Sequence, residues 1–141
     1  MANHALSTVN HAPQVVAEWV NLICEDLEWD DQGRAYMLLR ETLHAVRDYL
    51  SVDEAADLSA QLPVLIRGIY FDGWIPSRTP AHPRSKEDFL GRISAPFTET
   101  PLDDAERAAS AVFDVLRRKI SEGEFGQVAN AMRKPLRDLW L

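Results

Sequence analysis

The sequence contains very little cysteine: Cys24 is the only one among 141 residues. A single cysteine excludes an intramolecular disulfide and a cysteine-based zinc site, and this usage fits a reducing compartment. Glu25 and Asp26 follow it directly, and neighbouring negative charge raises the pKa of a thiol and suppresses the reactive thiolate. We therefore expect Cys24 to be a packing residue on a helix and not a nucleophile.

Long apolar runs are absent as well. No segment approaches the roughly twenty apolar residues that a membrane-spanning helix requires. Residues 1–13 have neither the basic region nor the apolar region of a signal peptide. We expect a soluble, unexported protein that stays in the cytoplasm and does not bind membranes.

Positive charge is scarce, since 15 Lys and Arg stand against 22 Asp and Glu and give a formal net charge of −7. Binding to phosphate backbones depends on many Lys and Arg side chains that displace condensed counterions. The composition therefore excludes general affinity for nucleic acid or anionic lipid, and it leaves room only for a local basic patch.

The common catalytic and metal-binding motifs are missing too. There is no G-x-S-x-G turn and no Gly-rich phosphate loop that ends in Lys-Ser or Lys-Thr. The acidic run at residues 25–31, read as a calcium loop from Glu28, has Leu39 at the twelfth position, where a bidentate glutamate is needed. The histidines lack the H-x-x-x-H spacing of a metal site; they are His4, His11, His44 and His82. We expect no metal, no cofactor and no catalytic residue.

Apolar residues at helical spacing fill most of the chain, while strict two-residue alternation is absent, so the pattern predicts an all-α fold. Six segments show this periodicity, at about residues 15–23, 35–50, 55–69, 89–93, 105–120 and 125–139. Pro63 and Pro135 fall inside the third and the sixth segment. Because proline removes a backbone hydrogen bond and clashes with the preceding turn, we expect a kink or a break near both.

The sequence also matches itself when it is shifted by 70 positions, without a gap, from residues 35–70 to residues 105–140. Leu43 then meets Phe113, and Tyr70 meets Trp140. This match predicts a six-helix bundle made of two three-helix repeats related by pseudo-twofold symmetry. We expect one domain over residues 1–141, with repeats at about 13–70 and 85–140, a linker at 73–84 and one shared core.

Several helix starts can be recognised from their capping residues. S-x-x-E occurs twice, from Ser51 and from Ser121, and it is the signature of a capping box. Ser85 precedes an acidic first turn in the same way. Thr100, followed by Pro101 and an aspartate, predicts a fourth start, because proline is tolerated at the first helical position.

Two stretches give the chain a family resemblance: LPVLIRGIYFDGW at residues 62–74, and S-x-E-[DE]-F at residues 85–89. With the sequence around them, they resemble the bacterial family known as domain of unknown function 2267, over about residues 15–140. Members of that family are small all-helical proteins built from a duplicated unit, which agrees with the internal match. The resemblance implies no activity, and no catalytic residue can be transferred from it.

The stretch from residue 67 to residue 85 is the one locally basic and aromatic segment of this acidic sequence. Such a segment can hold a phosphate or a carboxylate by charge-assisted hydrogen bonds while a ring stacks on an attached group. The candidate ligand-binding residues are Arg67, Tyr70, Trp74, Arg78 and Arg84. The competing interpretation is purely structural: Gly73 ends a helix, and the prolines stiffen a crossover between the two repeats.

Three functions follow as hypotheses. The first is a non-enzymatic module for contact with a protein partner or with a second copy of the chain, because catalytic motifs are missing and Leu139, Trp140 and Leu141 are apolar. The second is a small anionic-ligand binder that uses the region of residues 67–92. The third is a metal-independent hydrolase or transferase whose acid/base pair is brought together only by the fold.

Overall fold

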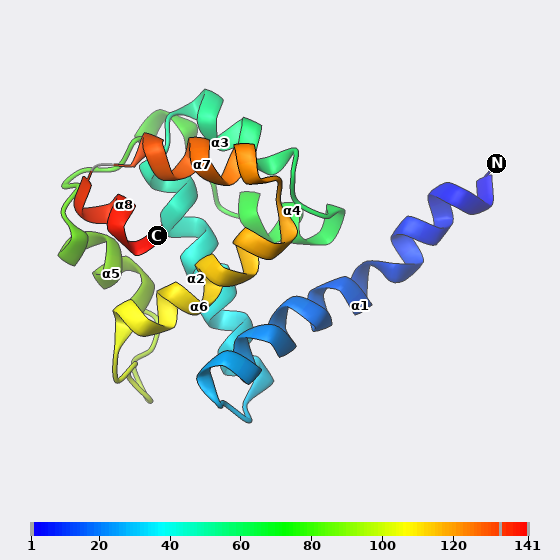
Figure 1. The fold of residues 1–141 in the computed structure, drawn as a ribbon, viewed down its shortest axis with the longest axis horizontal. Coiled ribbons are helices and arrows are strands. Elements are labelled where there is room, and N and C mark those ends of the chain that lie inside the picture. Colours follow the sequence, from blue (N-terminus) through cyan, green and yellow to red (C-terminus); the bar gives the residue numbers. More distant parts are fainter. Residues whose placement is uncertain (1, 133, 141) are drawn as a thin grey trace.

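The computed structural model describes residues 2–132 and 134–140, with side chains from Leu6 onward. Within this part the chain is all-α, as predicted, and has no strand (Figure 1). It forms eight α-helices and one short 3-10 helix: α1 (Ala2–Leu27), α2 (Gln32–Tyr49), α3 (Val52–Ser59), α4 (Val64–Phe71), η1 (Pro76–Arg78), α5 (Lys86–Ser94), α6 (Ala105–Lys119), α7 (Glu122–Ala131) and α8 (Lys134–Trp140).

Eight helices form where the sequence pattern predicts six, because the third and the sixth segment each form two helices. Breaks near Pro63 and Pro135 were predicted, and both are confirmed. The first lies between α3, which ends at Ser59, and α4, which Pro63 precedes as the N-cap residue. The second lies between α7 and α8, and Pro135 is the second residue of α8. Proline is tolerated there because the first-turn amides have no intrahelical partner.

The capping serines begin their helices as predicted, but only one capping box is complete. At α3, Ser51 accepts from the Glu54 amide at 3.2 Å, and the Ser51 amide donates to the Glu54 carboxylate at 2.9 Å. At α7, Ser121 accepts from the Glu124 amide at 3.1 Å, whereas the Ser121 amide donates to the side chain of Gln61, also at 3.1 Å. The Glu124 carboxylate is therefore free of the capping role. Ser85 caps α5.

The predicted helix start at Thr100 is wrong. Helix α6 begins at Ala105, with Asp104 as its N-cap residue. The carbonyls of Thr100 and Pro101 instead accept hydrogen bonds from the guanidinium of Arg34, at 2.6 and 3.2 Å. This long-range contact holds the segment before α6 out of the helix, and the aspartate supplies the cap.

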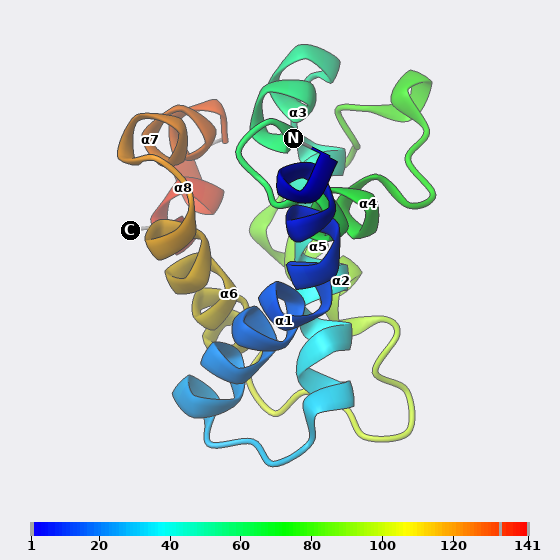
Figure 2. The same cartoon turned by 90° about the vertical axis from the view of Figure 1, so that its right-hand side faces the viewer.

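Helices α2 and α6 pack against each other at the centre of the molecule (Figures 1 and 2). Helix α1 packs against α2, α4 and α6, while α5 packs against α2, α6 and α8. A chain of aromatic side chains runs through this core: the ring centroids of Tyr49 and Phe89 lie 5.2 Å apart, and those of Phe113 and Trp140 lie 4.3 Å apart. All the helices that lie against α2 or α6 contribute to one continuous apolar core.

The carboxyl-terminal end of the described chain is buried, whereas the amino-terminal helix extends from the body (Figure 1). Leu139 and Trp140 are buried in the core, so they are not part of an exposed contact surface, and Leu141 lies outside the described residues. The amino-terminal half of α1 extends away from the body (Figure 1). Among the helices of the described residues, none is long and apolar enough to cross a membrane.

Candidate functional site

A cavity of about 240 Å³ lies where the crossover between α4 and α5 passes over the end of α2. Three guanidinium groups and one carboxylate contribute to its wall, so the wall is basic although the chain is acidic. It is lined by Arg47, Asp48, Gly73, Ile75, Arg78, Thr79, Ala81 and Arg92.

Arg47 forms the floor of this cavity and is held rigidly. Its side chain is only 5% exposed. Its Nε donates to the Asp48 carboxylate at 2.8 Å, and one terminal nitrogen donates to the carbonyls of Tyr70 and Asp72, each at 2.9 Å. Because these carbonyls belong to the carboxyl end of α4 and to the cap that follows it, one side chain joins α2 to the start of the crossover.

Asp48, the hydrogen-bond partner of Arg47, connects the cavity wall to the far end of the crossover and to α5. Its backbone carbonyl accepts from the Ala81 amide at 2.7 Å, which anchors the far end of the crossover to α2. Its carboxylate also lies 3.8 Å from the guanidinium of Arg92, on α5. The Arg92 guanidinium stands 5.5 Å from the ring centroid of Tyr49, where a cation–π contact orients it.

Arg78 completes the wall from the end of η1, and it is exposed. Among residues 2–132 and 134–140, no carboxylate forms an ion pair with its guanidinium. Gly73, with a φ of +76°, turns the chain after α4. This left-handed conformation suits glycine, and it directs the crossover back over α2.

The five sequence-predicted residues do not gather in one place. Only Arg78 lines the cavity. Arg67 donates to the carbonyls of Ser59 and Leu62, at 2.8 and 2.9 Å, and so holds the break between α3 and α4.

The other three have contacts within the fold. Tyr70 is buried and donates to the carbonyl of Ala55 at 2.9 Å. Arg84 donates to the carbonyl of Tyr49, also at 2.9 Å. Trp74 is half-buried and packs its ring on Phe71, with centroids 5.1 Å apart. Within residues 67–85, Arg67, Tyr70, Trp74 and Arg84 thus make contacts that hold the fold, whereas Arg78 lines the cavity.

Sequence reasoning did not assign Arg47 and Asp48 to the cavity. The internal match pairs Arg47 with Arg117 and suggests an ordinary flanking arginine. Arg47 lies between the apolar residues Val46 and Leu50. This position in a buried stripe indicates that the arginine has a specific partner, because a buried charge needs one.

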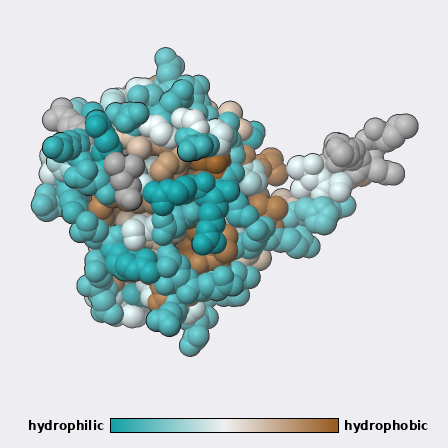
Figure 3. All heavy atoms as spheres, in the orientation of Figure 1, coloured by the Kyte–Doolittle hydropathy of each residue, from teal (hydrophilic) through white to brown (hydrophobic). Residues whose placement is uncertain are grey.

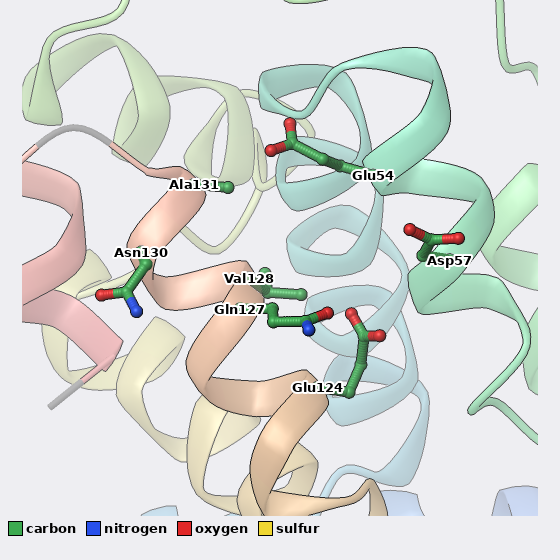
Figure 4. A pocket seen from close by; sticks show the side chains of 7 residues that line it. All are labelled: Glu54, Asp57, Glu124, Gln127, Val128, Asn130 and Ala131. Carbon is green, nitrogen blue, oxygen red and sulfur yellow. The ribbon is translucent and has the colours of Figure 1, made fainter.

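A second hollow, of about 410 Å³, lies between α3 and α7 and is acidic. In Figure 4 the side chains of Asp57 and Glu124 face the space between the two helices, with Gln127 beside Glu124. Burial, and then the charge of Asp57, raises the pKa of the Glu124 carboxyl above its ordinary value. It is lined by Glu54, Asp57, Glu124, Gln127, Val128, Asn130 and Ala131.

Within the part of the chain that the structure describes, no three His, Cys, Asp or Glu side chains are placed to hold a metal ion. The pKa of the Cys24 thiol is raised, chiefly by burial and further by Asp31, Asp30 and Glu25. That direction agrees with the unreactive thiol expected from the sequence.

The comparisons with known proteins agree with the resemblance in the sequence. Comparison with curated proteins finds no match. One family, described as "Uncharacterized conserved protein (DUF2267)", matches residues 16–139, which span the cavity and all of its walls. The match covers most of the chain and every helix from the second half of α1 to α8. The chain therefore belongs to the DUF2267 family.

Proposed function

We propose that this protein binds a small anion, a phosphate or a carboxylate, in the basic cavity between α2, the crossover and α5. The observation that carries the proposal is Arg78, an arginine that lines a cavity beside Arg92 and has no carboxylate partner among the described residues. The role is one of binding, without a reaction and without a metal or cofactor.

The geometry favours an oxyanion. A guanidinium presents parallel N–H donors that match a carboxylate or phosphate, and it keeps its charge at every physiological pH. Arg47 is already fixed by three acceptors, so it adds positive charge to the floor without needing to move. Arg78 and Arg92 then supply the donors, while Ile75, which is 45% exposed, offers an apolar contact for the remainder of the ligand.

The acidic surroundings favour selectivity. The rest of the chain is strongly negative, so an anion is repelled from most of the surface and attracted only to this basic wall. Binding by exposed guanidinium groups depends on screened Coulomb attraction, and the affinity is expected to fall as salt is raised from about 0.01 M to 0.15 M.

The test is a thermal-shift screen at low salt with inorganic phosphate, sulfate and a set of mono- and dicarboxylates. A ligand at a hundred times its dissociation constant stabilises the folded state by about 2.7 kcal/mol. Arg78→Ala is expected to abolish the shift. Arg118→Ala, which removes an exposed arginine of α6, is the matched control and is expected to keep it.

Calorimetric titration of the best ligand then measures the affinity in both variants. A melting temperature that no anion moves would exclude the proposal. So would a shift of equal size in Arg78→Ala and in the unmodified chain, because the anion would then bind elsewhere.

We infer in addition that the fold is a duplicated unit, with repeats at about 13–70 and 85–140 joined by a linker at 73–84. Each copy has four helices, α1–α4 and α5–α8, where the sequence pattern predicts three, because the segments around Pro63 and Pro135 are each broken in two. Two equivalent contacts support this. Arg47 donates to the carbonyl of Tyr70, and Arg117, 70 positions later, donates to the carbonyl of Trp140, again 70 positions later. The neighbours of α1, which are α2, α4 and α6, likewise correspond to those of α5, which are α6, α8 and α2.

A further inference from the structure

The amino-terminal half of α1 carries an apolar face that is left uncovered by the rest of the described chain. This half extends beyond the body (Figure 1). Leu6 is 56% exposed and Val9 is 61% exposed. On the same helix, Val20 and Ile23 are buried. The face that the body covers in the second half of α1 is therefore open in the first half.

The open residues continue the buried stripe without a change of spacing. The stripe alternates steps of three and four along one face of α1, at Leu6, Val9, Pro13, Val16, Val20 and Ile23. This spacing is the seam of helix-to-helix packing. Helices as short as the extended half are only marginally stable in water by themselves, and packing of an apolar face supplies most of their stability. A surface that packs against Leu6 and Val9 would therefore stabilise this half of α1.

The charge distribution favours a second copy of the chain as the covering surface. Residues 1–17 contain no Asp, Glu, Lys or Arg, and Glu18 is the first charged residue. Two copies with a net charge of −7 repel each other through their bodies, and an uncharged extension is where they approach with the least repulsion. An apolar stripe on a helix also matches itself about a twofold axis, which is the geometry of an isologous dimer.

A second apolar feature lies next to the place where α1 leaves the body. Val64 is 50% exposed and Leu65 is 42% exposed, at the start of α4, and α4 packs against α1. Figure 3 shows hydrophobic residues gathered on the body near the base of the extension. Two antiparallel α1 helices bring the tip of each helix to the base of the other, where these side chains are available to Leu6.

We propose that the protein forms a homodimer in which the extended halves of two α1 helices pair antiparallel, with Leu6 and Val9 in the seam and α4 at each end. The contact joins two copies of the acidic body through the uncharged segment and leaves the basic cavity, on the far end of α4, open to solvent. It is independent of the proposed anion site, because no residue of that cavity takes part.

Sedimentation of the full chain over a concentration series tests this dimer. The unmodified protein is expected to be a dimer that dissociates on dilution. Leu6→Glu/Val9→Glu is expected to weaken dimerisation by about a hundredfold or more, because two apolar side chains leave a shared seam and like charges enter it. The matched control is Thr8→Glu/His11→Glu, which adds the same charges on the opposite face of the same turns and is expected to leave the dimer intact.

Three results would overturn the proposal. A strict monomer at every concentration would exclude the dimer, and so would equal dissociation constants in the seam variant and its control. Val64→Glu tests the antiparallel arrangement, and an unchanged dissociation constant in that variant would exclude it. Circular dichroism of each variant confirms that the body remains folded, so that loss of the dimer is not confused with loss of the fold.

Discussion

Arg47 joins α2 to the crossover through one buried side chain, and its removal leaves several groups without a partner. The Asp48 carboxylate and the carbonyls of Tyr70 and Asp72 all accept from it. Removal of one member of a buried ion pair typically destabilises a protein by 3–5 kcal/mol. We predict that Arg47→Met lowers the free energy of unfolding by about 3 kcal/mol, as measured by urea denaturation.

Arg118→Met provides the comparison for this prediction, because Arg118 is an exposed arginine of α6. Exposed substitutions usually change the free energy of unfolding by less than about 0.5 kcal/mol. Equal losses in the two variants would mean that the network around Arg47 does not hold the crossover.

His44 makes stability depend on pH. Its Nε2 donates to the carbonyl of Ile69 at 2.7 Å, and burial, with smaller effects from Arg47 and Arg40, lowers its pKa below the ordinary value. In the unfolded chain the imidazole takes up a proton near pH 6.5, whereas the folded state resists protonation until a lower pH. Neutral His44 therefore makes its full contribution to the free energy of unfolding above about pH 6.5. This contribution is lost as the pH falls through the lowered pKa of the folded state.

We predict that the free energy of unfolding of the unmodified protein falls between about pH 7 and pH 5, and that His44→Gln flattens this fall. Urea denaturation at half-unit steps of pH measures the slope. His82→Gln, at an exposed position, is expected to keep it. An unchanged slope in His44→Gln would assign the pH dependence to other groups.

The two S-x-x-E motifs give a matched test at the level of the helix. Glu54 closes the capping box of α3 by accepting from the Ser51 amide, while Glu124 makes no such bond because Gln61 takes the equivalent amide. We predict that Glu54→Ala lowers the free energy of unfolding by about 1 kcal/mol. Glu124→Ala is expected to leave it unchanged or to raise it, since burial and Asp57 oppose its charge. Thermal unfolding of both variants measures the difference. Equal losses of stability in the two variants would contradict the conclusion that only Glu54 closes a capping box.

Helix positions could be predicted from the sequence where local chemistry decides them. The capping serines, the apolar spacing and the two prolines act within one or two turns, so the starts at Ser51, Ser85 and Ser121 and both breaks are confirmed. The start at Thr100 fails for the opposite reason. A guanidinium 66 positions away in the sequence binds the carbonyl of Thr100, and no local pattern contains that information.

The basic cavity was predicted only in part, because its walls meet through the tertiary fold. Arg78 belongs to the basic segment of residues 67–85, from which the sequence predicts a ligand site, and it lines the cavity. Arg47 and Asp48 come from a helix about 30 positions earlier, and their part depends on how the crossover folds back over α2. Arg67 and Arg84 belong to the same basic segment as Arg78, but their guanidinium groups donate to backbone carbonyls of the fold. The sequence alone does not distinguish these three arginines.

At the scale of the whole molecule, the two halves share one core, so they are expected to unfold together. Phe89, on α5, is fully buried between Tyr49 of the first half and Phe113 of the second, with ring centroids at 5.2 and 6.3 Å. We predict that Phe89→Ala lowers the free energy of unfolding by about 3–5 kcal/mol, and that circular dichroism and tryptophan fluorescence keep a common midpoint. Val52→Ala, at an exposed position, is expected to shift neither midpoint. Two separated transitions would mean that each half of the chain has a core of its own. Only independent cores allow one half to lose its helices while tryptophan packing persists in the other.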